Sequence, residues 1–256
     1  MSINYRYLLS VVERSAEKDP SITILDYGCG RGEIIKIARS KKINMYGADI
    51  FHNGPSVMKQ LSEEGLLGDI IREIRDDRLQ FSDKSFDLII CNQVFEHIRD
   101  FNKVLGEIQR VLKPGGTLYA LFPSKEIYRE GHTGIPFLHR FSKNKIRYFY
   151  TLVLRQFGLG RGEKSKEIST AQWVEKKLNY MDTKTFYRSA NEIEILLNKY
   201  FFWNHKEEEI INFRAINLKN GFGNFLVKMM KIPGIKQLGN FAFTRLAGFL
   251  IVASPR

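Results

Sequence analysis

Apolar residues in the first half of the chain fall into short runs separated by amphipathic segments. The runs are rich in β-branched residues and predict five strands, over residues 22–27, 43–48, 70–74, 86–91 and 117–122. Between them, apolar positions recur every three or four residues and predict helices over residues 34–42, 55–64 and 101–112. Strands that alternate with helices favour a parallel sheet covered on both faces.

The pattern changes after residue 122. Residues 123–181 contain no clear strand, and aromatic and basic side chains are concentrated at 141–157. The remaining pattern predicts a helix over 183–200, a strand over 201–213, two amphipathic helices within 222–246 divided at Pro233–Gly234, and a closing strand over 248–253. We therefore expect an α/β fold with a doubly wound, mostly parallel, seven-stranded sheet and a helical lid insertion. Its units would be residues 1–122, the insertion 123–181, and the completion of the core at 182–256.

A glycine-rich loop, Gly28–Gly32, follows the first predicted strand and precedes the first predicted helix. Ligands of doubly wound sheets bind at this end of the strands, so chemistry is expected just after residues 27, 49, 81, 91 and 122. The third glycine comes one residue earlier than in the dinucleotide-binding pattern, and the carboxylate of Asp26 before the loop would repel a pyrophosphate. The loop instead suits a ligand with an ammonium or sulfonium group. Asp49, at the end of the second strand, is placed to accept hydrogen bonds from ribose hydroxyls. A structural turn and a capping carboxylate are the alternatives.

Five blocks of the sequence, in the same order, resemble the class I S-adenosylmethionine-dependent methyltransferases of the type 11/23 kind. The blocks are Ile24–Gly32, Tyr46–Ile50, Leu79–Ile89 (with Gln80 in place of the usual proline), Val94–His97 and Arg110–Gly116. Together they cover residues 20–123. The resemblance implies a Rossmann-like fold, S-adenosylmethionine as cofactor and S-adenosylhomocysteine as product, with residues 1–122 as the cofactor-binding half.

The resemblance also implies roles for the matching positions. Asp26, Gly28 and Gly30 would line the methionine part of the cofactor, whereas Asp49 would hold the ribose and Ile50 would cover the adenine. An acidic residue at the adenine edge is expected at Asp76 or Asp77; the spacing does not decide between them, and we take Asp77. The complete set of predicted cofactor-binding residues is Asp26, Tyr27, Gly28, Cys29, Gly30, Asp49, Ile50, Asp77, Asn92 and Gln93.

Methyl transfer to an alcohol needs a base, and histidine is the usual side chain for this work near neutral pH. We rank His132 first because it follows the fifth predicted strand, beside the expected cleft. His97 ranks second and His139 third, with a structural role as the alternative for each. His132 and His97 are therefore the predicted catalytic residues. No metal site is expected, and two cysteines cannot form a four-cysteine zinc site.

The net charge of +12 is unevenly distributed along the chain. Residues 1–122 are neutral overall, whereas residues 123–190 carry +8 and residues 191–256 carry +4. A basic, aromatic insertion at 123–181 on the acceptor side suits an anionic acceptor, such as a nucleotide-linked or lipid-phosphate-linked sugar. Residues 130–140 also resemble methyltransferases of bacterial cell-surface polysaccharide clusters. A lid whose basic groups are merely solvated is the alternative.

We therefore predict O-methylation of a small molecule or of a sugar or glycan precursor in polysaccharide biosynthesis. One alternative is an RNA methyltransferase that uses the basic half for phosphate attraction. Another is a non-catalytic cofactor-binding or scaffold protein. The sequence after the fourth strand lacks the motif of amino-group methylation of nucleic acids, and no Pro-Cys nucleophile is present for pyrimidine carbon methylation.

The sequence also bears on location. No apolar run approaches the ~20 residues of a membrane-spanning helix, and the first residues lack the features of a signal peptide. A cytoplasmic protein is therefore expected. The amphipathic, basic helices within 221–246 have three candidate roles: packing on the sheet, contact in a homodimer, or peripheral contact with the inner face of an anionic membrane.

Overall fold

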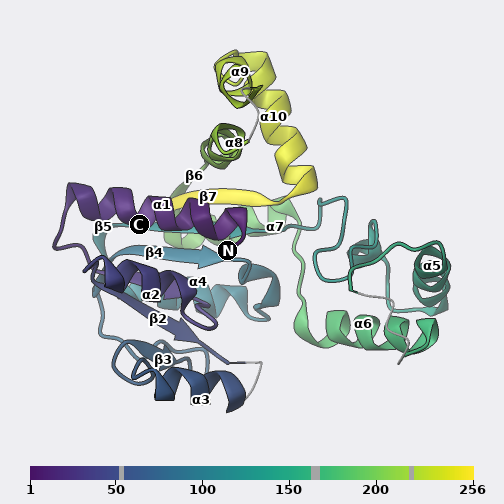
Figure 1. Cartoon of the computed structure of the whole chain (residues 1–256), viewed down its shortest axis with the longest axis horizontal. Helices are drawn as coiled ribbons and strands as arrows, with labels where there is room; N and C mark the ends of the chain where they lie inside the picture. Colours follow the sequence, from purple (N-terminus) through teal and green to yellow (C-terminus); the bar gives the residue numbers. More distant parts are fainter. Residues whose placement is uncertain (52–54, 163–167, 219–221) are drawn as a thin grey trace.

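The computed structural model describes residues 1–51, 55–162, 168–218 and 222–256. In these ranges the chain forms one seven-stranded sheet with helices on both faces (Figure 1). The strands are β1 (Ile24–Tyr27), β2 (Met45–Asp49), β3 (Ile71–Glu73), β4 (Phe86–Asn92), β5 (Leu112–Phe122), β6 (Phe201–His205) and β7 (Phe249–Pro255). Their order is β3-β2-β1-β4-β5-β7-β6, and only β7 runs antiparallel to its neighbours. The predicted doubly wound, mostly parallel, seven-stranded α/β fold is confirmed.

Two hydrophobic cores lie on opposite faces of the sheet. One contains the apolar stripes of α4 (Phe101–Val111) and α7 (Ala190–Tyr200). The other contains the buried faces of α1 (Ile3–Lys18), α2 (Glu33–Ser40), α3 (Pro55–Glu63) and α8 (Glu207–Ile216). The sequence pattern did not predict α1, because its buried apolar residues span only two turns between polar ends. The side chain of Ser2 caps this helix by accepting a hydrogen bond from the backbone N–H of Tyr5.

Two predictions for the second half were wrong. The predicted strand over 201–213 ends at His205, and α8 follows from Glu207. Three glutamates in the first turn of α8 stabilise a helix N-terminus, which explains why a charged run became a helix. The predicted helix over 183–200 is interrupted, because Ser189 begins α7 with a capping box that it shares with Glu192.

Residues 123–188 form a lobe beside the sheet, built on α5 (Lys145–Gln156) and α6 (Thr170–Lys184) (Figure 1). The lobe includes the short 3₁₀ turn η2 (Leu138–Arg140), and another short 3₁₀ turn, η1 (Phe95–His97), follows β4. The lobe has its own small apolar core around Trp173 and Val174. Arg147 of α5 forms a bidentate ion pair with Asp182 of α6, at 2.8 and 2.6 Å. The predicted insertion is thus a packed helical unit, of which residues 163–167 lie outside the described residues.

The amphipathic segment near the end of the chain forms α9 (Phe222–Met229) and α10 (Pro233–Leu246), divided as predicted. Helix α9 lies beyond α8, on the side away from the sheet, and α10 runs from there past α8 toward the start of β7 (Figure 1). Met230 and Phe243 are buried, and Phe243 joins the core beneath α8. Residue 221, the first residue of the segment 221–246 in the sequence prediction, lies outside the described residues. In the described part of the chain, no helix is long and apolar enough to cross a membrane.

Candidate functional site

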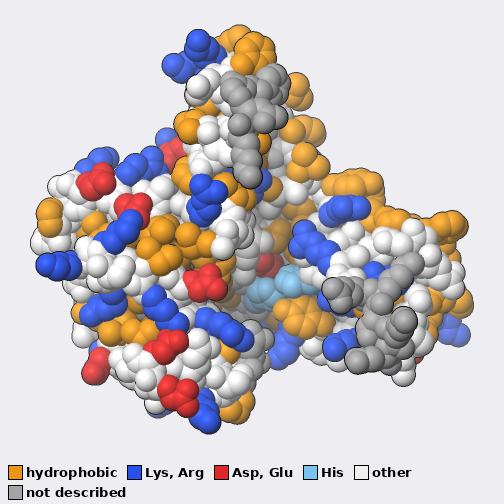
Figure 2. Space-filling view, viewed as in Figure 1, with side chains coloured by type: hydrophobic (Ala, Val, Ile, Leu, Met, Phe, Trp, Pro, Cys, Tyr) orange, Lys and Arg blue, Asp and Glu red, His pale blue; other side chains and the backbone are white. Residues whose placement is uncertain are grey.

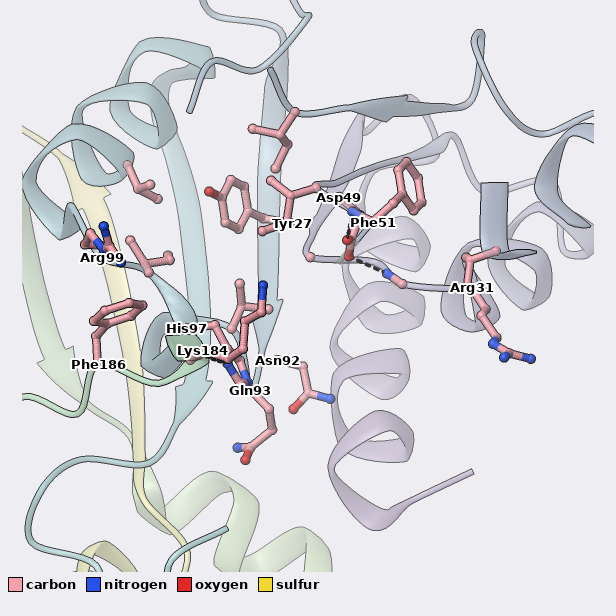
Figure 3. Close-up of a pocket in the computed structure, with 18 of the residues that line it drawn as sticks. Tyr27, Arg31, Asp49, Phe51, Asn92, Gln93, His97, Arg99, Lys184 and Phe186 are labelled. Atoms are coloured by element: carbon pink, nitrogen blue, oxygen red, sulfur yellow. Dashed lines mark hydrogen bonds between the residues drawn. The ribbon is translucent and has the colours of Figure 1, made fainter. Parts of the chain in front are cut away.

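A cavity of about 650 Å³ opens at the carboxyl ends of β1, β2 and β4. The strand order reverses between β1 and β4, which is where doubly wound sheets bind ligands. Figure 3 shows Tyr27, Asp49 and Asn92 entering this space from neighbouring strand ends, with His97 and Lys184 on the opposite side. The predicted residues that line the cavity are Tyr27, Gly28, Gly30, Asp49, Ile50, Asp77, Asn92, Gln93 and His97.

The glycine loop is held against the end of β2. Gly28 has a φ of +79°, and a Cβ at this position would collide with the side chain of Val94. The carboxylate of Asp49 accepts hydrogen bonds from the backbone N–H groups of Gly30 (2.8 Å) and Phe51 (2.7 Å) (Figure 3). Each carboxylate oxygen has lone pairs left for a further donor. Asp49 therefore fixes the loop and stays able to accept hydrogen bonds from a ligand.

Asp26 lies beneath the loop instead of lining the cavity. It is buried, and burial, with a smaller contribution from the nearby Asp49, raises the pKa of its carboxyl to about 7. Cys29 is also buried and does not line the cavity, and burial raises the pKa of its thiol. Their predicted roles in cofactor binding stay predictions, and neither residue lines the cavity.

The spacing of the sequence did not decide whether Asp76 or Asp77 reaches the cavity, but the structure distinguishes them. Asp77 lines the cavity, and its Oδ2 lies 3.3 Å from the Nζ of Lys103. Asp76 is exposed and does not line the cavity. Asn92 lines the cavity too, and its buried Oδ1 has no hydrogen-bond partner. Asp77 and Asn92 are thus the polar side chains available to a ligand on this side.

Sequence reasoning missed a second group of lining residues. They come from the start of the chain with α1, from the glycine loop, from the segments after β2 and η1, and from the end of α6 with its junction to α7: Ser2, Asn4, Tyr5, Arg31, Phe51, Arg99, Tyr180, Thr183, Lys184 and Phe186. Burial raises the pKa of Tyr5 to about 12, so its hydroxyl stays protonated. The Ser2 cap was a local signal for α1, but no local signal placed α6 beside the sheet.

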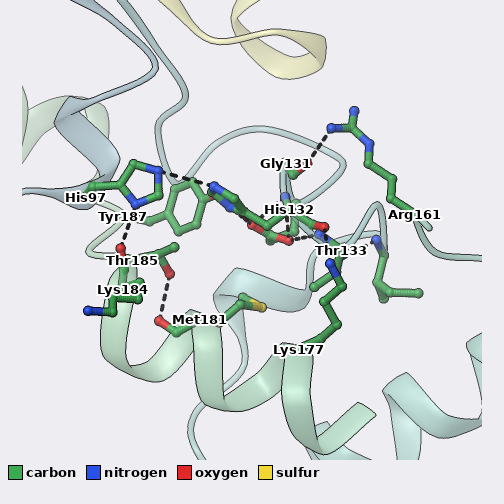
Figure 4. Close-up of polar contacts among 12 residues, drawn as sticks. His97, Gly131, His132, Thr133, Arg161, Lys177, Met181, Lys184, Thr185 and Tyr187 are labelled. Carbon is green, nitrogen blue, oxygen red and sulfur yellow. Dashed lines mark hydrogen bonds and ion pairs between the residues drawn. The ribbon is translucent and has the colours of Figure 1, made fainter. Parts of the chain in front are cut away.

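The two predicted catalytic histidines meet although they are 35 residues apart (Figure 4). The Nε2 atoms of His97 and His132 are 3.3 Å apart. His97 Nδ1 lies 2.6 Å from the carbonyl oxygen of Lys184, and His132 Nδ1 lies 2.8 Å from a carboxylate oxygen of Glu130. His97 lines the cavity, whereas His132 lies directly behind it.

Glu130 anchors this pair and was not predicted. Its carboxylate is fully buried and accepts hydrogen bonds from the backbone N–H of His132 (3.0 Å) and the hydroxyl of Tyr187 (2.7 Å). Burial alone would raise the pKa of Glu130, but the hydrogen bonds from His132 and Tyr187 overcome it and lower the pKa to about 2. Glu130 is therefore a charged carboxylate beside His132.

The other titratable groups near this pair are less suited to catalysis. His139 does not line the cavity. Its Nε2 lies 3.1 Å from the carbonyl oxygen of Lys125, and burial lowers the pKa of its imidazole. Glu96, next to His97, is buried, and burial raises the pKa of its carboxyl to about 8. In the described residues, no group of three or more His, Cys, Asp and Glu side chains is placed to hold a metal ion.

Comparison with known proteins bears on the same residues. Residues 25–120 match the family model described as a methyltransferase domain. This segment runs from β1 to β5 and contains the glycine loop, Asp49 and His97, but not the lobe.

Two curated proteins illustrate the range of relatives. The chain is 34% identical over 112 residues to the ubiquinone/menaquinone biosynthesis C-methyltransferase UbiE of Hydrogenovibrio crunogenus, covering 41% of this chain and 44% of that protein. It is 29% identical over 101 residues to the ubiquinone biosynthesis O-methyltransferase of Hahella chejuensis, covering 39% and 42%. The chain thus spans less than half the length of these relatives. A solved S-adenosylmethionine-dependent methyltransferase from Mesorhizobium loti matches with a TM-score of 0.49 and 16% identity, covering 92% of this chain and 91% of that one.

Proposed function

We propose that this chain, whose residues 25–120 form a class I S-adenosylmethionine-dependent methyltransferase domain, methylates an oxygen atom of a small molecule or sugar precursor. One observation carries the proposal: the glycine loop with Asp49 and the histidine pair meet across one cavity. The first arrangement suits a nucleoside ligand, and the second suits proton removal from a hydroxyl.

The residues of the cavity fit S-adenosylmethionine. Gly28 brings the backbone close to the ligand where a Cβ would collide with Val94. Asp49 would hold the ribose hydroxyls, and the unpartnered Oδ1 of Asn92 would accept a hydrogen bond from the ammonium group. When bound, the cofactor supplies an electrophilic methyl group on a sulfonium ion. Asp26 beneath the loop would be shifted toward its charged form by that cation.

The histidine pair is built to hold one proton. His97 donates its Nδ1–H to the carbonyl oxygen of Lys184, and His132 donates its Nδ1–H to the carboxylate of Glu130. The two Nε2 atoms then face each other at 3.3 Å, so a hydrogen bond between them requires one proton. When that proton is absent, the Nε2 lone pair of His97, the member of the pair that lines the cavity, would accept the proton lost by an acceptor hydroxyl, and the N–H bond so formed would then be shared with the Nε2 of His132. Glu130 offsets the positive charge that results.

Cationic side chains on the cavity support an anionic acceptor. Arg31, Arg99 and Lys184 line the cavity from the glycine loop, the turn after η1 and the end of α6. Arginine and lysine bind carboxylates and phosphates through charge-assisted hydrogen bonds. We therefore propose an acceptor with an acidic or phosphate group, such as a nucleotide-linked or lipid-linked sugar used in polysaccharide biosynthesis. An RNA acceptor and a non-catalytic scaffold are the rival functions.

The test begins with calorimetry on the intact protein with S-adenosylhomocysteine. Saturable binding at one site is expected, and no binding would reject the proposal. Turnover is then followed with methyl-labelled S-adenosylmethionine on nucleotide-linked sugars, lipid-phosphate sugars and short RNA. Label on a sugar oxygen supports the proposal, and label on RNA alone favours the first rival. Binding without turnover on any acceptor favours the scaffold.

A further inference from the structure

One face of helix α5 presents apolar side chains to the exterior, and the opposite face carries two buried arginines. The outward set, here called the outer stripe of α5, is Ile146, Phe149, Val153 and Phe157, with exposed fractions of 67%, 60%, 45% and 79%. These positions recur every three or four residues, so they share one face of the helix. The opposite face carries Arg147, Thr151 and Arg155, all buried.

The buried arginines prevent this helix from rotating its apolar face inward. Arg147 is held by its bidentate ion pair with Asp182. The guanidinium of Arg155 stacks 4.3 Å from the ring of Trp173 and donates to the carbonyl oxygen of Gly160. Breaking such buried pairs is costly, because it leaves a charge without its partner. The outer stripe is therefore a fixed feature of the lobe's surface.

A second apolar set lies on the α9–α10 projection. Its exposed members are Phe225, Ile232, Leu238, Phe241 and Leu246. Figure 2 shows hydrophobic side chains along this projection and over the lobe, on both sides of the hollow between them. Large apolar side chains that gather on exposed helix faces in this way can mark a site of interaction.

Positive charge predominates around both sets, although Glu208 of α8 lies 3.2 Å from Lys236 of α10 and Asp182 of α6 pairs with Arg147 of α5. Residues 131–162 contain six Lys and Arg and no Asp or Glu, and residues 210–256 contain seven Lys and Arg and no Asp or Glu. Lys145 beside the outer stripe is exposed, as are Lys228 and Lys231 between the apolar residues of α9 and α10. Aromatic and aliphatic side chains flanked by lysines are the composition of helices that lie on anionic membranes.

We propose that the outer stripe of α5 and the α9–α10 projection dock this protein on the surface of an anionic lipid bilayer. The apolar side chains enter the boundary between headgroups and acyl chains, and the lysines contact the headgroup phosphates. This inference does not depend on the methyl-transfer reaction. A second copy of the chain fits less well, because it would bring together two surfaces on which positive charge predominates.

The experiment is flotation of the intact protein with vesicles of phosphatidylcholine alone and of phosphatidylcholine with phosphatidylglycerol. Binding to the anionic vesicles only is expected, and it decreases with added salt. The double variant Phe149→Asp, Phe157→Asp lowers the partition coefficient tenfold or more, on the order expected for losing two buried aromatic rings. Leu238→Asp with Phe241→Asp does the same from α10. Lys145→Gln lowers it about fivefold.

The matched control is Ile195→Asp, an exposed apolar residue on α7 (53% exposed) outside both sets, which keeps wild-type binding. Thermal melting and S-adenosylhomocysteine binding of each variant show that the fold is intact. Failure of the wild-type protein to bind anionic vesicles overturns the proposal, as does equal loss in the control. A dimer that both double variants abolish, without vesicle binding, assigns the surface to a second copy instead.

Discussion

The two sides of the cavity are built in different ways. On the sheet side, each group follows directly after a strand: Gly28 after β1, Asp49 at the end of β2, and Asn92 at the end of β4. On the lobe side, the groups come from distant segments, because His97 meets His132 and Tyr187 bonds to Glu130 across 57 positions. The positions of the groups on the sheet side are set by backbone conformation, whereas the positions of those on the lobe side are set by hydrogen bonds between side chains.

In the proposed function, this difference separates cofactor binding from proton transfer. The sheet side presents backbone N–H groups and carboxylates for the cofactor, and the matched family segment ends with it. The lobe contributes His132 and Glu130, which lie outside that segment, whereas His97 lies within it. Residues 123–190 also carry +8 of the net charge of +12. A substitution on the lobe side should therefore lower kcat and leave cofactor affinity unchanged, and a substitution on the sheet side should lower cofactor affinity. The following variants test this separation.

The largest effect is expected on the lobe side. His132→Ala, or Glu130→Gln as the positioning variant, removes the partner that holds the proton at His97. We expect kcat to fall about 100- to 10,000-fold, the usual loss on removing a general base. Affinity for S-adenosylhomocysteine, measured by calorimetry, stays unchanged.

His205→Ala is the control, because His205 lies on the edge strand β6 and does not line the cavity. Full activity of the His132→Ala variant would remove the histidine pair from the reaction. A parallel loss of cofactor affinity would break the separation of the two sides.

On the sheet side, Asp49→Ala removes the acceptor that holds Gly30 and Phe51 and that, in the proposed function, would face the ribose. Two charge-assisted hydrogen bonds are worth roughly 3 kcal/mol or more, so affinity for S-adenosylhomocysteine should fall at least about 100-fold. Asp69→Ala, at an exposed position after α3, is the matched control. Unchanged affinity of Asp49→Ala in calorimetry would contradict the assignment of the ribose site.

Glu96 joins the two sides, since it follows β4 and its carbonyl oxygen accepts from the N–H of Phe186. Burial raises the pKa of its carboxyl from 4.5 to about 8. The folded protein keeps a proton that the unfolded chain releases as the pH rises from about 4.5 to about 8, so stability falls across this window. We expect Glu96→Gln to differ little from the wild type near pH 5 and to be on the order of 4 kcal/mol more stable near pH 8 in denaturant unfolding.

Asp26 contributes a similar loss of stability as the pH rises, because burial raises its pKa to about 7. The comparison therefore concerns the difference between Glu96→Gln and the wild type at each pH. Parallel pH profiles of the two proteins would show that Glu96 ionises in the folded state as it does in the unfolded chain.

The smallest effect distinguishes the two neighbouring acids. Asp77→Asn should weaken S-adenosylhomocysteine binding about fivefold, the loss of one partly exposed hydrogen bond, whereas Asp76→Asn should leave it unchanged. Asp77 lines the cavity and Asp76 does not. Calorimetry measures S-adenosylhomocysteine affinity in both variants. A larger loss of affinity for Asp76→Asn than for Asp77→Asn would assign the contact with the ligand to Asp76 instead.

The same contrast explains what the sequence could predict. Strand ends of a parallel sheet share one edge, so local motifs were enough to bring Gly28, Asp49 and Asn92 together. Ranking the histidines was also possible, but their pairing through Glu130 depends on how the lobe packs, which no local spacing encodes. The helix α8 was missed because the three glutamates in its first turn, which favour a helix N-terminus, outweighed the apolar pattern.

Strand β7 has a consequence for the order of folding. It follows β6 along the chain, yet it lies between β5 and β6 in the sheet. Strand β6 therefore cannot join the sheet until residues 249–255 have left the ribosome, although β1 to β5 can pair earlier. During synthesis, the side of β5 that later receives β7 stays open as an unpaired strand edge. That edge is the place where the nascent protein most needs protection from aggregation.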